Sequence, residues 1–540
     1  MNPFDTLLVA VHEALDRLAQ RGTLPADLPL ERITVEPPRE RGHGDAATNA
    51  ALILAKPARL KPLVIAEALA AELAGVEALA TAEAVPPGFV NMTFTDAFVQ
   101  AQVPVVLRAG GDYGRSTIGR GERVNIEFCS ANPTGPLHVG HGRGTVFGDA
   151  LAELLAFAGF SVSREYYIND AGAQIEILAR SIHHRYLEAL GDDPGPVPEG
   201  LYPLRELVPV AEAIAARDGA RWRSAHEAEW LEAFGREGTA YMLERIKADL
   251  AALGVVHDVF TSERGLVEAG KVEAALEHLD RLNLLYTGTL PPPKGKQLED
   301  WEPVPQLLFK ASAYGDDIDR PLKRSTGAWT YFAADLAYHL DKYERGFAQM
   351  IDVWGADHGG YVKRMQAAVK ALSQGDASLD IRLCQLVNLM DAGQPLKMSK
   401  RAGRIVTLKD VVDEVGRDAF RFIMLTRKND AALDFDLAKV VEQSRDNPVF
   451  YVQYAHARIC SVLRNARADG HGDWLDDPAT APLDSLTDPA ELQLLKMAIQ
   501  FPRLIKTAAV QHEPHRIAFY LHDLASDFHA LWNRGKEDGN

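Results

Sequence analysis

The sequence VNIEFCSANPTGPLHVGH, residues 124–141, begins as a strand and ends as the first turn of a helix. Residues 124–129 predict a buried strand, and a loop rich in Pro and Gly follows them. A helical pattern then runs from 139 to 158, where Gly159 ends it, and a second strand is predicted over 161–168. This order of strand, loop, helix and strand is the unit from which parallel sheets are built.

Segments on both sides of this unit predict further domains. The expected helices of the N-terminal part cover 3–21, 46–56 and 62–74, and its strands cover 33–35, 79–85 and 89–95. Additional strands of the parallel sheet are expected at 350–354 and 381–390. The prediction is an α/β protein with an α+β domain over 1–110, a Rossmann-like parallel-sheet domain over 120–425 with an insertion at about 195–308, and an all-α domain over 426–540.

Composition and charge exclude several classes of protein. Of the 540 residues, 47% are hydrophobic and 25% are charged, and no apolar run is long enough to cross a bilayer. The formal net charge of −17 argues against a protein that coats DNA nonspecifically, but it allows an RNA partner held by local basic patches. The three cysteines lie far apart without a CxxC pair, which disfavours zinc and disulfides and favours a reducing cytoplasm.

His138 and His141 define a first motif, HVGH, at the predicted start of the helix. Their spacing places both side chains on the first turn, and Gly140 leaves room beside them because it has no Cβ. A helix N-terminus attracts anions, and a ring N–H on each histidine can add a donor to a phosphate. The histidines are therefore predicted to stabilise charge and not to act as nucleophiles. The alternative is a helix start with two incidental histidines.

A second motif, Lys397-Met398-Ser399-Lys400, lies in a loop that follows a predicted strand and a turn. Lysine side chains in such a loop can reach phosphates as mobile point charges. Most short lysine clusters are only solvated basic turns. The presence of both motifs, in this order and on these elements, favours a site for nucleotide phosphates.

HVGH and KMSK resemble the two signature motifs of class I aminoacyl-tRNA synthetases, and the residues around them resemble arginyl-tRNA synthetases specifically. The matching segments are Glu127 with 130–133, 167–172, 315–320, 331–339 and 354–361. The resemblance implies ligation of arginine to the terminal adenosine of tRNA(Arg) through an arginyl-adenylate. It also implies ATP as substrate, Mg²⁺ on the ATP phosphates, no zinc, and activation of arginine only with tRNA bound. We expect a monomer in the cytoplasm.

The resemblance also assigns roles to individual residues. The expected catalytic groups are His138, His141 and Lys400, with Lys397 secondary. The expected ATP-binding residues are Pro133, Gly135, His138, Gly140, His141, Gly355, Asp357, Met398, Ser399 and Lys400. The expected arginine-binding residues are Glu127, Ser130, Asn132, Tyr331, Asp335 and His358. Glu127 and Asp335 match the acids that hold the guanidinium, and carboxylates are the natural partners of this planar cation with five N–H donors.

Both end domains are expected to contact the tRNA. The N-terminal part resembles the family's additional domain at 42–49, which implies contact with the tRNA elbow. The C-terminal helices resemble its anticodon-binding domain, which usually continues further, so a shortened version is expected. The candidate tRNA-binding residues are Asn49, Tyr451, Tyr454 and Trp532. The aromatic ones are chosen because unpaired RNA bases stack on aromatic rings. Neither a membrane nor DNA is expected as a partner.

Three alternatives remain open. Another class I synthetase would need cations where Glu127 and Asp335 stand if it bound glutamate, and a Cys/His zinc set if it bound cysteine. A nucleotidylyltransferase shares the HxGH helix but is usually shorter and lacks the helical C-terminal domain. A non-catalytic RNA-binding paralogue is disfavoured because His138, His141 and Lys400 are all present.

Two substitutions should separate arginine binding from activation. Asp335→Ala should abolish discrimination for arginine, because the guanidinium loses a carboxylate partner. Lys400→Ala should slow activation with little change in arginine binding, because its charge is expected on the phosphates. The exchange rate between ATP and pyrophosphate and the KM for arginine would be measured for each variant. Equal effects of both substitutions on both quantities would contradict this division of roles.

Overall fold

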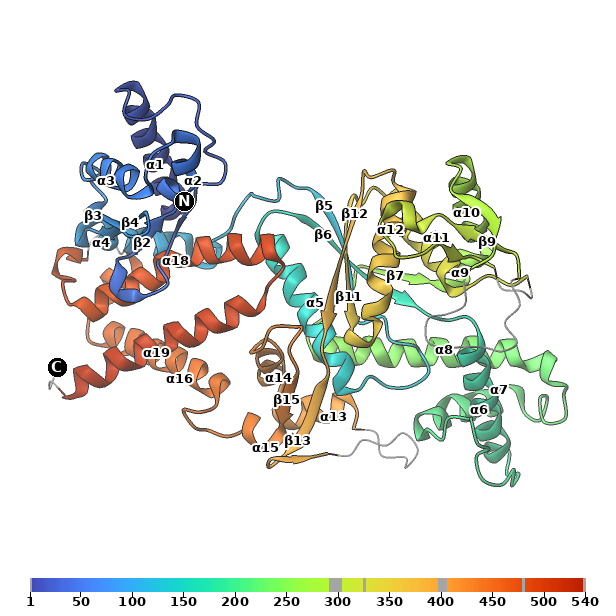
Figure 1. Cartoon of the computed structure of the whole chain (residues 1–540). Coiled ribbons are helices and arrows are strands. Elements are labelled where there is room, and N and C mark those ends of the chain that lie inside the picture. The colour runs from blue at the N-terminus through green and yellow to red at the C-terminus, as the bar shows by residue number, and fades with distance from the viewer. Residues whose placement is uncertain (1, 291–303, 324–326, 397–405, 478–480, 538–540) are drawn as a thin grey trace. The chain divides into compact units, whose positions relative to one another are not determined.

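The chain folds into two units, shown in the computed structural model of Figure 1. One unit combines Met1–Ile118 with Ser444–Asn540, and the other is Gly119–Gln443. The structure describes residues 2–290, 304–323, 327–396, 406–477 and 481–537. The first predicted domain and the third predicted domain from residue 444 onward therefore belong to one unit.

A five-stranded parallel sheet, in the order β12-β11-β5-β6-β7, forms the centre of the 119–443 unit. Its strands are β5 (Arg123–Glu127), β6 (Ser161–Ile168), β7 (Val259–Ser262), β11 (Gln349–Gly355) and β12 (Ser378–Cys384). The predicted parallel sheet is confirmed. From β5 the chain adds strands first on one side and then on the other, so the order reverses between β5 and β11. In open parallel sheets, ligands bind outside the carboxyl ends of the strands at such a point.

Helices and two small sheets complete this unit. The helices are α5 (Val139–Phe157), α6 (Ala173–Ala189), α7 (Val208–Asp218), α8 (Glu227–Ala252), α9 (Glu263–Glu268), α10 (Lys271–Arg281), α11 (Tyr331–Glu344), α12 (Val362–Leu372), α13 (Leu408–Val415), α14 (Arg417–Met424) and α15 (Leu437–Val440). One small sheet has the order β10-β9-β8, with strands Arg320–Pro321, Gln306–Phe309 and Leu285–Gly288. The other has the order β14-β13-β15, with strands Gln394–Pro395, Val387–Asp391 and Leu433–Asp436.

Three expectations for this unit need correction. The insertion expected at 195–308 is not one separate block, because it contains β7, an edge strand of the main sheet. The single strand expected at 381–390 is two strands, of which β12 joins the main sheet and β13 joins the small one. The boundary expected at residue 425 lies too early, because β15 pairs in parallel with β13 and so keeps 426–443 in this unit.

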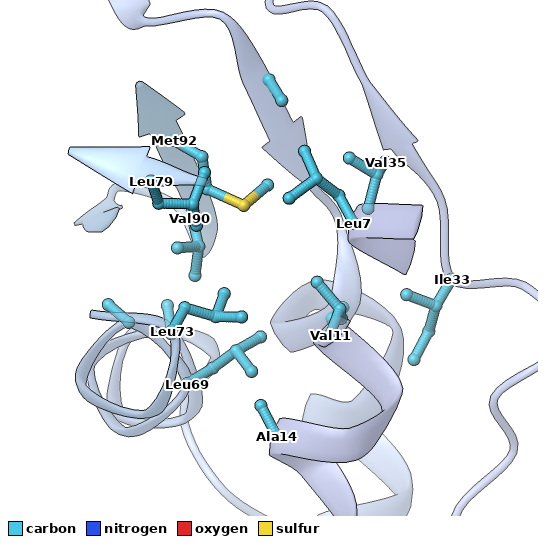
Figure 2. Close-up of a cluster of buried hydrophobic side chains, with 14 of the residues drawn as sticks. Leu7, Val11, Ala14, Ile33, Val35, Leu69, Leu73, Leu79, Val90 and Met92 are labelled. Carbon is cyan, nitrogen blue, oxygen red and sulfur yellow. The ribbon is translucent and has the colours of Figure 1, made fainter. Parts of the chain in front are cut away.

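The N-terminal part of the other unit is a four-stranded antiparallel sheet with helices packed on it. Its strands, in the order β1-β2-β4-β3, are Val35–Glu36, Ala46–Thr48, Phe89–Phe94 and Leu79–Val85. Its helices are α1 (Pro3–Gln20), α2 (Ala50–Ala58), α3 (Pro62–Leu73) and α4 (Asp96–Ala109). The helix expected at 46–56 was wrong at its start, because Ala46–Thr48 pairs with β4 as a strand. Figure 2 shows the apolar side chains of α1 and α3 gathered against this sheet.

The C-terminal helices complete this unit. They are α16 (Pro448–Ala468), α17 (Gly472–Asp476), α18 (Pro489–Gln511) and α19 (His515–Glu537). Leu492 and Ile499 of α18 are buried in the same apolar core as α1 and α3. Lys496 of α18 also forms a 2.9 Å ion pair with Asp45. This shared core explains why two ends of the chain fold as one unit.

Gly148 is expected to control how closely α5 packs on the end of β5. A Cβ on Gly148 would lie 2.3 Å from Cγ of Phe128, whereas a Cβ on Gly144 would meet nothing closer than 3.8 Å. Gly148→Ala should therefore destabilise the protein by about 1–3 kcal/mol through overpacking. Gly144→Ala, on the same helix, should be neutral or stabilising by up to about 1 kcal/mol. Urea unfolding of both variants followed by circular dichroism would measure this, and equal stability would contradict it.

Candidate active site

The HVGH histidines lie where β5 leads into α5. His138 is the N-cap of α5, and His141 lies in its first turn. The Nδ1 atom of His138 accepts from the backbone N–H of Gly140 at 3.1 Å, and the Nδ1 atom of His141 accepts from the backbone N–H of His138 at 3.2 Å. Because both Nδ1 atoms are acceptors, each neutral ring carries its hydrogen on Nε2. The backbone thus selects the tautomer of both histidines.

Gly140 is required by this arrangement. The two imidazole rings stack with their centroids 3.8 Å apart. A Cβ on Gly140 would lie 2.9 Å from Cε1 of His138. A side chain at this position would push against the ring that caps the helix, which agrees with the reason inferred from the sequence.

The KMSK residues, Lys397, Met398, Ser399 and Lys400, lie outside the described residues. Two described residues that follow the second motif, Thr407 and Leu408, pair with the backbone at the first motif. Thr407 pairs with His138 in an antiparallel bridge, and the backbone N–H of Leu408 donates to the carbonyl of Leu137 at 2.7 Å. The segment that follows the second motif therefore lies directly beside the first motif.

Glu127 and Asp335 approach the same region from different elements. Glu127 is the last residue of β5, and its carboxylate accepts from Oγ of Ser130 at 3.0 Å and from Nζ of Lys342 at 2.8 Å. Asp335 lies near the start of α11 and accepts from the hydroxyl of Tyr361 at 2.7 Å. Burial raises the pKa of both carboxyls. The charge of Lys342 opposes this rise in the pKa of Glu127, and the Tyr361 hydrogen bond opposes it in the pKa of Asp335.

Tyr167 of β6 lies close to both of these acids. Burial raises the pKa of its phenol, and the charges of nearby carboxylates raise it further. These carboxylates belong to Glu263, Asp335, Glu127 and Asp170. The structure therefore brings the two predicted acids together around one aromatic ring, with two more acids beside them. A cluster of several carboxylates is suited to binding a cation.

Glu263 was missed by the sequence analysis. It follows β7 directly and is half-buried, and burial together with the charges of Asp335 and Asp170 raises the pKa of its carboxyl to about 7. Among the described residues it makes no ion pair. No strand is predicted at 259–262 from the sequence, because these residues lie within the expected insertion at 195–308. Only the pairing of β7 with β6 brings Glu263 close to the other acids.

The remaining predicted arginine-binding residues lie around the carboxyl ends of the same strands. The loop after β5 turns sharply, since Cys129 and Ser130 have φ values of 70° and 38°. This turn directs Ser130 Oγ back toward Glu127, where it also accepts from the backbone N–H of Tyr167. Asn132 is exposed and donates from Nδ2 to Oε1 of Gln174 at 2.8 Å. Left-handed backbone at residues other than glycine is costly and concentrates at functional sites.

Several other predicted residues are exposed at this edge. Tyr331 starts α11 one turn before Asp335 and is 65% exposed. Gly355 is the last residue of β11, and Asp357 and His358 follow it, with His358 Nε2 3.5 Å from a carboxylate oxygen of Asp357.

In the first loop, Pro133 is buried, and a Cβ on Gly135 would lie 3.2 Å from a methyl of Leu204. The carboxyl edges of β5 and β11 therefore carry the described part of the expected ATP site.

The candidate tRNA-binding residues lie in the other unit. The side chain of Asn49 accepts from the backbone N–H of Thr34 at 2.8 Å and donates to the carbonyl of Arg32 at 3.3 Å, so its amide anchors a loop. The aromatic candidates gather between α16 and α19, around Arg458 and His529. The guanidinium of Arg458 lies over the rings of Tyr454 and Trp532, and the ring of Tyr451 lies 4.4 Å from that of His529.

No described helix has both the length and the apolar character needed to span a membrane. In the same residues, no cluster of at least three His, Cys, Asp or Glu side chains is suited to hold a metal ion.

Family models match three stretches of the chain. Residues 5–94 match the arginyl tRNA synthetase N terminal domain, residues 102–194 match the catalytic domain of class I (R) tRNA synthetases, and residues 452–536 match the DALR anticodon binding domain. The order of these matches is the order of the domains predicted from the sequence.

Whole-chain comparisons point to the same family. The arginine–tRNA ligase of Nitrobacter hamburgensis is 57% identical over 99% of this chain and 91% of its own length. That of Rhodospirillum rubrum is 55% identical over 100% of this chain and 93% of its own length. The solved arginyl-tRNA synthetase of Thermus thermophilus superposes with a TM-score of 0.73 at 25% identity, over 98% of this chain and 92% of that one. The chain belongs to the arginyl-tRNA synthetase family.

Proposed function

We propose that the chain is an active arginine–tRNA ligase, which uses ATP to attach arginine to the terminal adenosine of tRNA(Arg) and releases AMP and diphosphate. One observation carries this proposal. The acids around Tyr167 cluster at the carboxyl edge of the parallel sheet, and the helix that starts with the HVGH histidines begins at the same edge. The activation of arginine requires a site for its cationic side chain next to a site for the phosphates of ATP.

The first step forms a bond between a carboxylate oxygen of arginine and the α-phosphorus of ATP, and it breaks the bond to diphosphate. It needs no general base, because a carboxylate is already ionised near pH 7. The protein therefore contributes in-line positioning and stabilisation of charge. His138 and His141 carry their ring hydrogens on Nε2 and would donate them to phosphate oxygens. Lys400, Lys397 and Mg²⁺ would neutralise the phosphates, an assignment that rests on the sequence alone.

The acidic pocket would select the substrate. A guanidinium is permanently charged and presents N–H donors along its edges, so it can satisfy several carboxylates at once. Asp335 and Glu263 are the candidates for direct pairing, with Tyr331 at the exposed rim. Both oxygens of Glu127 already accept hydrogen bonds from Lys342 and Ser130, so Glu127 would add charge to a pocket wall that is held in place. A shorter or uncharged amino acid would leave buried carboxylates unpaired.

The second step transfers the arginyl group to the hydroxyl of the terminal adenosine of tRNA and releases AMP. The match of 452–536 to an anticodon-binding domain supports tRNA as the partner. The aromatic residues Tyr451, Tyr454 and Trp532, beside the guanidinium of Arg458, offer stacking surfaces for unpaired bases. The hydrogen bonds that occupy the amide of Asn49 favour a structural role for that residue. We expect the protein to act as a cytoplasmic monomer.

Exchange of diphosphate with ATP tests this function. The exchange should depend on L-arginine and should appear only when tRNA(Arg) is present. The assay would compare arginine with lysine, glutamate, cysteine and no amino acid, each with and without cognate tRNA. Exchange supported by another amino acid, or by none, would reject the proposal. Arginine-dependent exchange without tRNA would reject only the tRNA requirement.

Glu263 provides a test that includes pH. Arginine should bind the ionised carboxylate, and the pKa of about 7 means that this form is lost below neutral pH. The KM for arginine should therefore fall as pH rises from about 6 to 8 and then level off. Glu263→Gln should raise this KM about tenfold to a hundredfold at pH 8, the size expected for one hydrogen bond to a charged group.

The matched control for Glu263 lies on the same short helix. Glu268 is exposed and pairs with Arg236 at 3.2 Å, so Glu268→Gln should leave both the KM and its pH dependence unchanged. If Glu263→Gln behaves like Glu268→Gln, then Glu263 does not bind arginine.

A further inference from the structure

Lys342 is a buried cation that the proposed mechanism leaves unused. Its side chain is fully buried in α11, and its Nζ donates to Oε2 of Glu127 at 2.8 Å and to Oδ1 of Asp352 at 3.0 Å. The ammonium also lies 4.2 Å from the centre of the Tyr338 ring. A buried ammonium is stable only when it is paired and hydrogen-bonded, and here two carboxylates and an aromatic face supply these partners.

Asp352 extends this contact toward Asp335. Its second oxygen lies 3.0 Å from Nε2 of His339. The other ring nitrogen of His339, Nδ1, lies 2.8 Å from the backbone carbonyl oxygen of Asp335. One continuous chain of contacts therefore runs from Glu127 through Lys342, Asp352 and His339 to the helical turn that carries Asp335.

Secondary structure brings these five residues together. Asp335, His339 and Lys342 are spaced four and then three residues apart, so they lie along one face of α11. Glu127 and Asp352 are register partners on the adjacent parallel strands β5 and β11. The chain of contacts thus joins the helix to both strands at the place where the strand order reverses.

The cost of this arrangement argues that it does more than stabilise the fold. Burying a cation with two anions requires their desolvation, and apolar residues of similar size often stabilise a core as well or better. The ions instead control the charge and the position of the Glu127 carboxylate. Burial raises the pKa of this carboxyl, and the Lys342 charge is the largest influence that keeps it ionised. The network therefore favours the ionised form of Glu127 and fixes the position of its carboxylate.

We propose that Lys342 is a positioning residue for arginine: together with Asp352 and His339 it holds the Glu127 carboxylate and the Asp335 turn at a fixed separation, so that arginine enters a preformed pocket. This inference rests on the proposed function, in which Glu127 and Asp335 belong to the arginine site. Lys342 itself would not touch the substrate. A pocket that is already in place spares the ligand the cost of ordering it.

The test compares Lys342→Met, which removes the charge and keeps the length, with Lys342→Arg, which restores a cation. The KM for arginine, the KM for ATP and kcat would be measured by exchange in the presence of tRNA, together with the melting temperature. Lys342→Met should raise the KM for arginine by at least about tenfold, the size associated with losing an orienting partner behind a ligand. The KM for ATP should change by less than about twofold, and Lys342→Arg should recover part of the loss.

Lys271 offers a matched control. It also pairs with two carboxylates, those of Asp341 and Glu344 on α11, at 3.1 and 3.0 Å. It lies on α10 and is partly exposed, away from the chain of contacts. Lys271→Met should leave the KM for arginine unchanged, although it removes a lysine that is bound to the same helix.

The pH dependence separates positioning from general loss of structure. The titratable groups around Glu127 are Lys342, Tyr338 and His339 of α11, Asp352 of β11, and Tyr167 and the register partner Glu165 of β6. Without the lysine, the Glu127 carboxyl should hold a proton at neutral pH and lose it as the pH rises. In Lys342→Met the KM for arginine should therefore fall between pH 7 and 9 more steeply than in the unchanged chain. A misfolded protein would not recover in this way.

Further variants distinguish loss of the fold, loss of the positioning role and failure of the proposed arginine site. If Lys342→Met does not fold, Asp352→Asn keeps the side-chain shape and should also raise the KM for arginine. A folded Lys342→Met or Asp352→Asn whose KM for arginine stays within about twofold would overturn the inference, and so would loss of the fold in both variants. Asp335→Asn tests the proposed arginine site itself. If it leaves this KM unchanged, that site is wrong. If only Asp335→Asn raises it, the site stands and the positioning role fails.

Discussion

The parallel pairing of β5 with β11 is the contact on which the rest of the 119–443 unit depends. It joins strands that lie more than two hundred residues apart in the chain and places Glu127 opposite Asp352. Two acids on adjacent strands of a buried sheet need a cation, and Lys342 of α11 supplies it. The same pairing creates the reversal of strand order, so the edge that carries these charges is also the edge where a ligand can enter.

Different physical means prepare the two halves of this edge. At the start of α5, backbone N–H groups fix the ring tautomers of His138 and His141, and no charged side chain is needed to orient them. On the proposed arginine side, burial raises the pKa of Asp335 and Glu263, and the charges of neighbouring carboxylates raise both further, so a bound cation would stabilise their ionised forms. The proposed phosphate side thus offers donors in a fixed geometry, and the proposed arginine side offers charge that is only partly compensated.

Local patterns predicted the elements that are formed by neighbours in sequence. The strand at 161–168 and the helices at 3–21 and 62–74 were found nearly at their true ends, because periodic burial and flanking Gly or Pro residues are local signals. The errors lie where pairing is not local. Ala46–Thr48 has helix-forming alanines but is a strand because it pairs with β4. The pattern of 381–390 predicts one strand, because nothing local shows that its halves join different sheets.

The same distinction holds for the site. The residue types and spacing of HVGH were enough to propose a phosphate site, because charge and hydrogen-bonding capacity are properties of the side chains themselves, and the resemblance to arginyl-tRNA synthetases assigned Glu127 and Asp335 to a guanidinium. Glu263, Lys342 and Asp352 carry no motif, and their roles come from the pairing of β7 with β6 and of β11 with β5. The amino-acid sequence by itself determined which chemistry is present. Tertiary structure alone decided which charges are buried, paired or left for a ligand, because desolvation depends on neighbours that only folding assembles.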